Sequence, residues 1–280
     1  MGELVFSPTS SEAWSTCPTW WTEGYRKGWR SRVATKADVS RLMGVGFGHG
    51  MALHNMKKQC LMVQQDLTPA QVVQAELDRL LKAGVDCSVF AEMGDLEETL
   101  TRSLEYASQH DPTPPDWKVT EVEHPHPEAG SARCDVVYTR LDGEKVVRDY
   151  KFKLAFEEAK WLAKTLWTYE HSDQVPHYLW MTGARTFFLT IYKASPKPTL
   201  VVEQPFRWTT AELERWVEKQ RYKWAMMEQH KEKPETAWMS SVHESKYGPC
   251  PLADWCCVHQ REEGKRGIAG LLQITKEVKG

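Results

Sequence analysis

Apolar residues recur with two different periods along the chain, and the change between them divides it into two parts. Over residues 36–109 the spacing is helical, with helix starts expected at Asp38 or Ser40, at Thr68-Pro69 and at Asp95. The proline-rich stretch 111–115 ends this part. Beyond it, short runs rich in β-branched and aromatic residues predict strands over 117–123, 134–140, 144–151, 186–192 and 199–206.

Helices are expected to interrupt and follow the strands. One carries Lys160 and Lys164, and another runs from Thr210 to about His230. The predicted order along the chain is helices, a hairpin, a helix and further strands. This order is typical of a central mixed β-sheet flanked by helices. We therefore predict a single α/β domain over 1–280, with a helical part at 36–109, a sheet at 117–206 and a Cys-rich substructure formed by 1–35 and 240–260.

Composition narrows the class of protein without naming a function. The chain has 280 residues, 36 Lys+Arg against 38 Asp+Glu, and 41% hydrophobic residues, as is ordinary for a soluble globular protein. No stretch approaches 18 consecutive apolar residues, so no membrane helix is expected. The first residues lack a secretory signal, which favours a cytoplasmic protein. A net charge of −2 argues against a basic surface over the whole chain but not against a local basic groove.

Two predicted strands flank Leu-Asp-Gly at 141–143, a hairpin signature whose loop length decides the chemistry. A two-residue turn would place Asp135 opposite Tyr150, and the carboxylates of Asp135 and Asp149 would then project from opposite faces. A three-residue loop with Gly143 left-handed would instead place Asp135 opposite Asp149, with their Cβ atoms roughly 5 Å apart.

In the second arrangement, Asp135, Asp149 and Lys151 share one sheet face, because strand side chains alternate. Facing carboxylates repel each other unless a cation lies between them. The trio therefore indicates a site for a hard cation such as Mg²⁺ or Mn²⁺, with Lys151 orienting or deprotonating an attacking water. A solvated strand end without a function is the alternative interpretation.

Asp135 followed by Asp149-Tyr150-Lys151 resembles the signature of the PD-(D/E)XK nucleases, with Asp in the place often held by Glu. The context resembles their RecB/AddB branch, which includes CRISPR-associated adaptation exonucleases and phage relatives. That branch has a Gly-x-x-x-His helix motif before the sheet and a Gln-x-x-x-Tyr motif after the Lys. Here these are matched by Gly50–His54 and Gln174–Tyr178.

The resemblance implies a restriction-endonuclease-like core and a set of metal ligands. These are His54, Asp135, Asp149 and the carbonyl of Tyr150, holding Mg²⁺ or Mn²⁺. It also implies that Gln174 and Tyr178 lie near the substrate backbone or organise the active site. From the residues alone, His54 is equally an ordinary helix residue, and the Gln-Tyr pair the start of an amphipathic helix.

The cysteines resemble the family's iron–sulfur staple, with one departure. Cys17 and the pair Cys250 and Cys256 match three positions, but Tyr247 stands where the family has another Cys. The resemblance implies a 4Fe-4S cluster held by Cys17, Cys250 and Cys256, and Cys257 is the candidate for the fourth ligand, which the family pattern does not supply. Histidine at 243 or 259, zinc in place of the cluster, or no metal at all are the alternatives.

Together these features lead us to expect a metal-dependent deoxyribonuclease, an exonuclease acting on DNA ends or single strands. A helicase, recombination protein or integrase is a conceivable partner, and the resemblance suggests a prokaryotic or phage-infected host cell. The alternative is a non-catalytic DNA-binding or assembly subunit that keeps the nuclease fold. A structural metalloprotein with an incidental acidic hairpin is a further rival.

Overall fold

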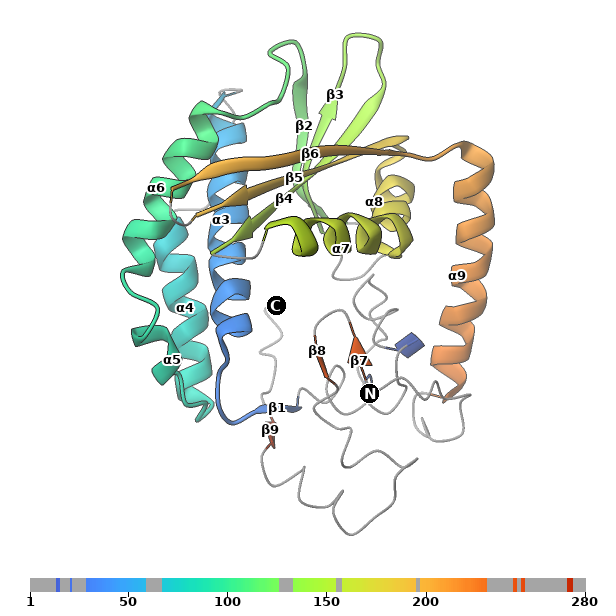
Figure 1. Ribbon diagram of the computed structural model, residues 1–280. Coiled ribbons are helices and arrows are strands. Elements are labelled where there is room, and N and C mark those ends of the chain that lie inside the picture. Colours follow the sequence, from blue (N-terminus) through green and yellow to red (C-terminus); the bar gives the residue numbers. More distant parts are fainter. Residues whose placement is uncertain are drawn as a thin grey trace.

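The computed structural model describes most of the chain between residues 29 and 230 and short pieces near both ends. The described residues are 14–15, 21, 29–58, 67–125, 133–154, 158–194, 197–230, 244–245, 248–249 and 271–273. They form an α/β arrangement in which helices flank a five-stranded sheet (Figure 1). Within them, no helix combines the length and the apolar character that spanning a membrane requires.

The five-stranded sheet contains every strand predicted from the alternating pattern, each within two residues of its expected bounds. Its strands, in spatial as well as sequence order, are β2 (Lys118–Pro125), β3 (Arg133–Thr139), β4 (Lys145–Lys153), β5 (Thr186–Lys193) and β6 (Thr199–Arg207). β4 and β5 are parallel, and the other neighbours are antiparallel. The sheet is therefore mixed, as predicted.

The helical part packs on one face of this sheet. It consists of α3 (Lys36–Lys58), α4 (Pro69–Lys82), the short α5 (Ser88–Ala91) and α6 (Leu96–Gln109). Thr68 caps α4 with a reciprocal hydrogen bond to Gln71, and Asp95 caps α6, as expected. The expected cap of α3 was wrong. Thr35 takes that place, and the Asp38 carboxylate reaches back to its backbone N–H at 2.9 Å.

The other face of the sheet is covered by α7 (Glu158–His171) and α8 (Gln174–Thr182), with α9 (Thr210–His230) beyond them (Figure 1). β4 and β5 are parallel, so a tight hairpin turn cannot connect them. α7 and α8 form the longer crossover connection instead. The carboxylate of Asp173 fastens α8 to α9 by accepting from Trp216, Gln220 and Lys223 at 2.6–3.0 Å.

The two layers bury two hydrophobic clusters. On the α3 side, Phe47 of α3 stacks on Phe152 of β4 with ring centroids 4.8 Å apart. On the α8 side, Leu179 and the strand residues Val147 and Leu189 are fully buried. The catalytic candidates of β4 therefore lie on a strand whose two faces are both covered by helices.

The two ends of the chain meet below this core. β1 (Trp29–Ser31) pairs antiparallel with β9 (Leu271–Gln273), and β7 (Glu244–Ser245) pairs with β8 (Gly248–Pro249). Trp14 and Trp21 pack edge to face and contact Met227 of α9. This β-pair uses residues 271–273, beyond the range 240–260 expected for the substructure, so the expected joining of 1–35 with 240–260 stays a prediction. The cysteines assigned to a cluster, Cys17, Cys250, Cys256 and Cys257, lie outside the described residues, and the described part gives no support for a metal substructure.

Candidate active site

The β3–β4 hairpin adopts the three-residue loop. The backbone N–H of Arg140 donates to the carbonyl of Glu144 at 2.9 Å, and Gly143 has φ = 83°. This left-handed conformation suits glycine because it has no Cβ. The ladder then continues from Thr139↔Lys145 to Val136↔Arg148, a register that brings Asp135 opposite Asp149.

Asp135 lies where the β3–β4 ladder stops. The last backbone pair is Val136↔Arg148, and at the next place the Asp135 carboxylate accepts a hydrogen bond from the backbone N–H of Tyr150 at 2.8 Å. The side chain thus satisfies a backbone donor that the ladder leaves without a strand partner. Asp135 is half-buried. Asp135 therefore connects β3 to β4 where their ladder ends, and it also supplies carboxylate oxygen atoms to the candidate site.

Asp149 and Lys151 form a close ion pair on the face covered by α7 and α8. The Lys151 ammonium lies 2.7 Å from Asp149 Oδ2, and the Tyr169 hydroxyl of α7 donates to the same oxygen at 3.4 Å. The Asp149 side chain is 1% exposed, and its other oxygen, Oδ1, is buried without a hydrogen-bond partner among the described residues. A buried carboxylate oxygen in that state is costly unless a ligand satisfies it.

The electrostatics of the pair set the charge of Lys151. Burial by itself lowers the pKa of the ammonium, but attraction by Asp149, Tyr169 and Asp135 outweighs it and raises the pKa well above the usual value. Lys151 is therefore held as an ammonium by its ion pair with Asp149. A cation bound to Asp149 would offset most of this attraction, so both roles expected for Lys151, orienting an attacking water or deprotonating it, stay predictions.

The Gln174–Tyr178 motif lies on α8, beside this pair. Asp173 holds the N-cap position and Pro176 lies in the first turn, and the Asp173 carboxylate bonds α9 rather than α8. Tyr178 is buried, and burial together with Asp149 raises the pKa of its hydroxyl. Tyr178 is thus brought next to Asp149 and Lys151, and Gln174 lies one turn before it.

His54 has a different neighbour, Asp111, the first residue of the proline-rich stretch that follows the helical part. The His54 Nε2 lies 3.9 Å from Asp111 Oδ2, and the Lys58 ammonium is 4.0 Å from the same oxygen. The Asp111 side chain is 2% exposed, and this Oδ2 accepts no hydrogen bond from the described residues. Burial lowers the pKa of His54, while Asp111 opposes the change. A neutral imidazole is the form that binds metals.

Asp111 also connects His54 to the strand that bears the acidic pair. Asp111 Oδ1 accepts from the Tyr150 hydroxyl at 3.5 Å, and that hydroxyl is 3.2 Å from the hydroxyl of Tyr138. Tyr138 in turn donates to the fully buried Asn55 at 2.6 Å. This buried polar network explains why a tyrosine stands between Asp149 and Lys151. No signal in a single sequence marks Asp111, because its partners are distant along the chain.

The predicted metal ligands fit a cation only in part. The acidic pair of Asp135 and Asp149 offers hard oxygen ligands, and the unsatisfied Asp149 Oδ1 is an atom that a cation would satisfy. His54, however, is directed toward Asp111. In the described part of the chain, no three His, Cys, Asp or Glu side chains converge closely enough to hold a metal ion.

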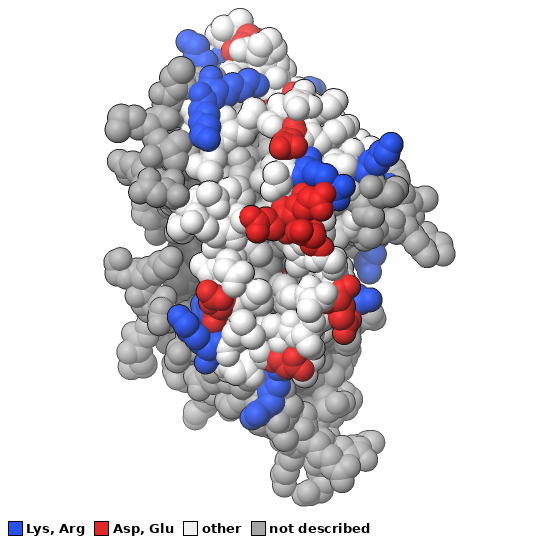
Figure 2. Space-filling model, turned by 90° about the vertical axis from the view of Figure 1, so that its left-hand side faces the viewer, with Lys and Arg blue, Asp and Glu red and all other residues white. Residues whose placement is uncertain are grey.

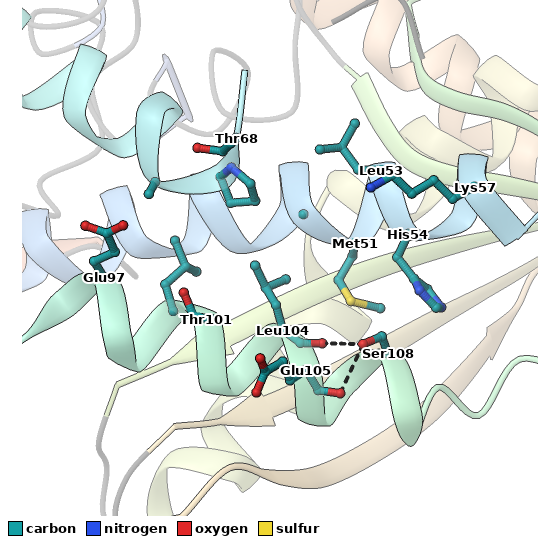
Figure 3. Close-up of a pocket in the computed structure, with 14 residues that line it drawn as sticks. Met51, Leu53, His54, Lys57, Thr68, Glu97, Thr101, Leu104, Glu105 and Ser108 are labelled. Carbon is teal, nitrogen blue, oxygen red and sulfur yellow. Dashed lines mark hydrogen bonds between the residues drawn. The ribbon is translucent and has the colours of Figure 1, made fainter. Parts of the chain in front are cut away.

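A cavity of about 470 Å³ opens beside His54, between α3, α4 and α6 (Figure 3). His54 and Lys57 lie at one end of it and Glu97 at the other, with Leu100 and Leu104 along its wall. The Gly-x-x-x-His motif accounts for this geometry. A Cβ on Gly50 would lie 2.5 Å from a methyl group of Leu104, so Gly50 lets α6 approach α3, and His54 follows one turn later.

The outer surface of the helical layer is not a basic track. Figure 2 shows acidic side chains gathered in the middle of this face, with Lys and Arg spread around them. α6 begins with the acidic residues Glu97 and Glu98. A polyanion would therefore gain little from this face, and basic surface has to be sought on the other side of the sheet.

Comparisons with known proteins leave the family open. No protein-family description matches the chain, and no curated protein is similar to it. Among solved structures, it is similar to one described as "Crystal structure of SSO0001", with 12% sequence identity, over 69% of this chain and 76% of that one. The TM-score of 0.22 is too low for that likeness to bear on fold or function.

Proposed function

We propose that the chain is a metal-dependent deoxyribonuclease of the PD-(D/E)XK type, an exonuclease on DNA ends or single strands. The observation that supports it best is the arrangement of Asp135, Asp149 and Lys151. Two carboxylates are placed opposite each other at the end of a ladder, and one of them keeps a buried oxygen without a hydrogen-bond partner. Repulsion makes this arrangement unfavourable in a purely structural hairpin.

Each residue has a role that follows from its surroundings. Asp135 and Asp149 would hold Mg²⁺ or Mn²⁺, which when bound polarises a phosphodiester and lowers the pKa of water. Lys151 would place the attacking water or stabilise negative charge at the phosphate. The Tyr169 hydroxyl of α7 donates to Asp149, and Tyr178 of α8 lies beside the ion pair. His54 is proposed as a further ligand on the sequence resemblance alone, since its imidazole faces Asp111 on the side of the sheet covered by α3, whereas Asp149 lies on the side covered by α7 and α8.

The test is loss of end-labelled single-stranded DNA in the presence of Mn²⁺, with and without EDTA. Protein prepared without oxygen should be used, so that an iron–sulfur cluster, if present, survives. We expect Asp149→Asn and Lys151→Met to lower cleavage by at least about 100-fold. Asp116→Asn is the matched control, since Asp116 is an exposed carboxylate in the turn before β2. Full activity of either site variant would overturn the site assignment.

A non-catalytic DNA-binding or assembly subunit is the second candidate, and one observation favours it. The Lys151 ammonium already neutralises Asp149 at 2.7 Å, as it would in a site that no longer binds a metal. On this alternative the wild type binds DNA without cutting it in any divalent metal. Isothermal titration calorimetry with Mn²⁺ distinguishes the two candidate functions. The nuclease must bind Mn²⁺, and Asp149→Asn must abolish that binding.

We also propose that Cys17, Cys250, Cys256 and Cys257 bind a 4Fe-4S cluster. Two observations support a connection between these ends of the chain. β1 pairs with β9, and Trp14 and Trp21, on either side of Cys17 in sequence, pack against α9. Anaerobic purification should give a brown protein that absorbs at about 400 nm, and Cys17→Ala should remove this absorption. A colourless protein carrying stoichiometric zinc would point to zinc instead.

A further inference from the structure

The outward face of α7 carries an aromatic residue that the core does not use. Trp161, Leu162, Leu166 and Tyr169 point into the hydrophobic cluster under α7. Trp167 lies on the opposite side of the helix and is 62% exposed. An exposed tryptophan ring offers a face on which an unpaired base can stack.

Trp167 is held as a flat platform rather than as a loose side chain. Its ring stacks on that of His171 with centroids 4.4 Å apart and an interplanar angle of 22°. The imidazole is in turn fixed, since His171 Nδ1 lies 2.8 Å from the carbonyl oxygen of Trp167. A planar, pre-ordered ring loses little conformational entropy when another ring stacks on it.

Basic side chains lie on the same face of α7 as this platform and on the strand that carries the candidate active site. Lys164 is exposed one turn before Trp167. The Lys153 ammonium lies over the ring of Trp161 at 5.2 Å, and Lys151 of the ion pair is 34% exposed two residues earlier in β4. Glu170 is also exposed on this helix, so the surface is only moderately basic. Stacking rather than charge must supply most of the affinity.

From this geometry we infer that the outward face of α7, formed by Lys164, Trp167 and His171, binds single-stranded DNA and guides it to the strand end of β4. A base stacks on Trp167, and neighbouring phosphates contact Lys164. The inference rests on the proposed nuclease function for the choice of ligand. Single strands are specified because only unpaired bases expose a ring face for stacking.

The test measures the affinity of a fluorescein-labelled oligothymidylate by anisotropy in EDTA, where no cleavage occurs. We expect Trp167→Ala to weaken binding by about 5- to 100-fold, with Trp167→Phe keeping most of the affinity. Lys164→Ala should reduce the salt slope by about one. Tyr222→Ala is the matched control, since Tyr222 is a 72% exposed aromatic residue on α9, and its affinity should equal that of the wild type.

The outcomes distinguish this surface from the nuclease activity. Wild-type affinity in Trp167→Ala and Trp167→Glu, or an equal loss in Tyr222→Ala, overturns the surface even if the protein cuts DNA. Absence of binding by the wild type at low salt, or equal affinity for duplex DNA, overturns it too. Binding that depends on Trp167 without cleavage in Mn²⁺ supports the surface and removes the proposed nuclease.

Discussion

The carboxylate of Asp135 accepts a hydrogen bond from the backbone N–H of Tyr150, 2.8 Å away, at the end of the β3–β4 ladder. One acidic side chain thus has both a structural task and a proposed chemical one. The two tasks are separable by substitution, because an amide can still accept the hydrogen bond but is a poor ligand for a hard cation.

Asp135→Asn is therefore expected to retain most of the stability and lose activity. Asp135→Ala leaves the Tyr150 N–H without its partner and should cost about 1–3 kcal/mol in the free energy of unfolding. Urea denaturation of both variants beside the wild type measures the difference. Equal stability of the Asn and Ala variants would show that the hydrogen bond from the Tyr150 N–H does not contribute to the free energy of unfolding.

The hairpin loop offers a test of the register. Deleting Leu141, which is 79% exposed, leaves a two-residue Asp-Gly turn that still pairs Arg140 with Glu144. The deletion should therefore keep Asp135 opposite Asp149, and with it the melting temperature and any cleavage of the wild type. Loss of cleavage in a deletion variant that is well folded would contradict the prediction that this register is sufficient to keep the site active.

Two glycines of α3 should respond in opposite ways to replacement by alanine. Gly50→Ala places a methyl group within 2.5 Å of Leu104 and should destabilise the protein by about 1–3 kcal/mol. Gly48→Ala meets nothing within 4 Å and should stabilise it by up to about 1 kcal/mol through helix propensity. Thermal unfolding measures both. A destabilised Gly48→Ala with a normal Gly50→Ala would mean that α6 does not pack as described.

His54 should make stability depend on pH. Burial lowers its pKa in the folded protein below the ordinary value of about 6.5, so the unfolded chain binds more protons between the two values. The free energy of unfolding therefore falls as the pH drops below about 6.5, and His54→Gln should remove that part of the slope. Urea titrations between about pH 5 and 8 measure it, and parallel slopes for the two proteins would contradict the lowered pKa.

Asp111 should act on the same titration. Its carboxylate opposes the lowering of the His54 pKa, so Asp111→Asn should lower this pKa further. An NMR titration of the His54 ring protons in both proteins tests the direction. Asp142→Asn, a change of an exposed carboxylate in the hairpin loop, is the control and should leave the titration unchanged. A rise of the His54 pKa in Asp111→Asn would mean that the two side chains do not face each other.

The local sequence pattern was enough to predict the helices and strands, but it does not show how they pack against one another. The strands were found because alternation, glycine and proline act over a few residues, and Thr68 and Asp95 were recognisable caps for the same reason. The loop at 141–143 had two possible lengths in the sequence, and only the observed pairing of Arg140 with Glu144 decides between them. Asp111 escaped notice because its distant partners come from α3 and β4.

The acidic pair with Lys151 was predictable because one hairpin supplies all three residues. The contact of His54 with Asp111 was not, because it depends on how α3 lies over the sheet. Sequence resemblance placed His54 with Asp135 and Asp149, and that grouping stays a prediction. Stacking of Trp167 on His171 was also missed, since i, i+4 aromatic spacing on a helix is common and says nothing about exposure.

The pairing of β1 with β9 has a consequence for how the protein is made. Residues 29–31 pair with residues 271–273, so the pair cannot form until residues 271–273 have been synthesised. The sheet from β2 to β6 is available to fold on the ribosome before then. Residues 29–31 therefore wait for their partner while the whole sheet is made, and formation of this β-pair is expected to follow folding of the sheet.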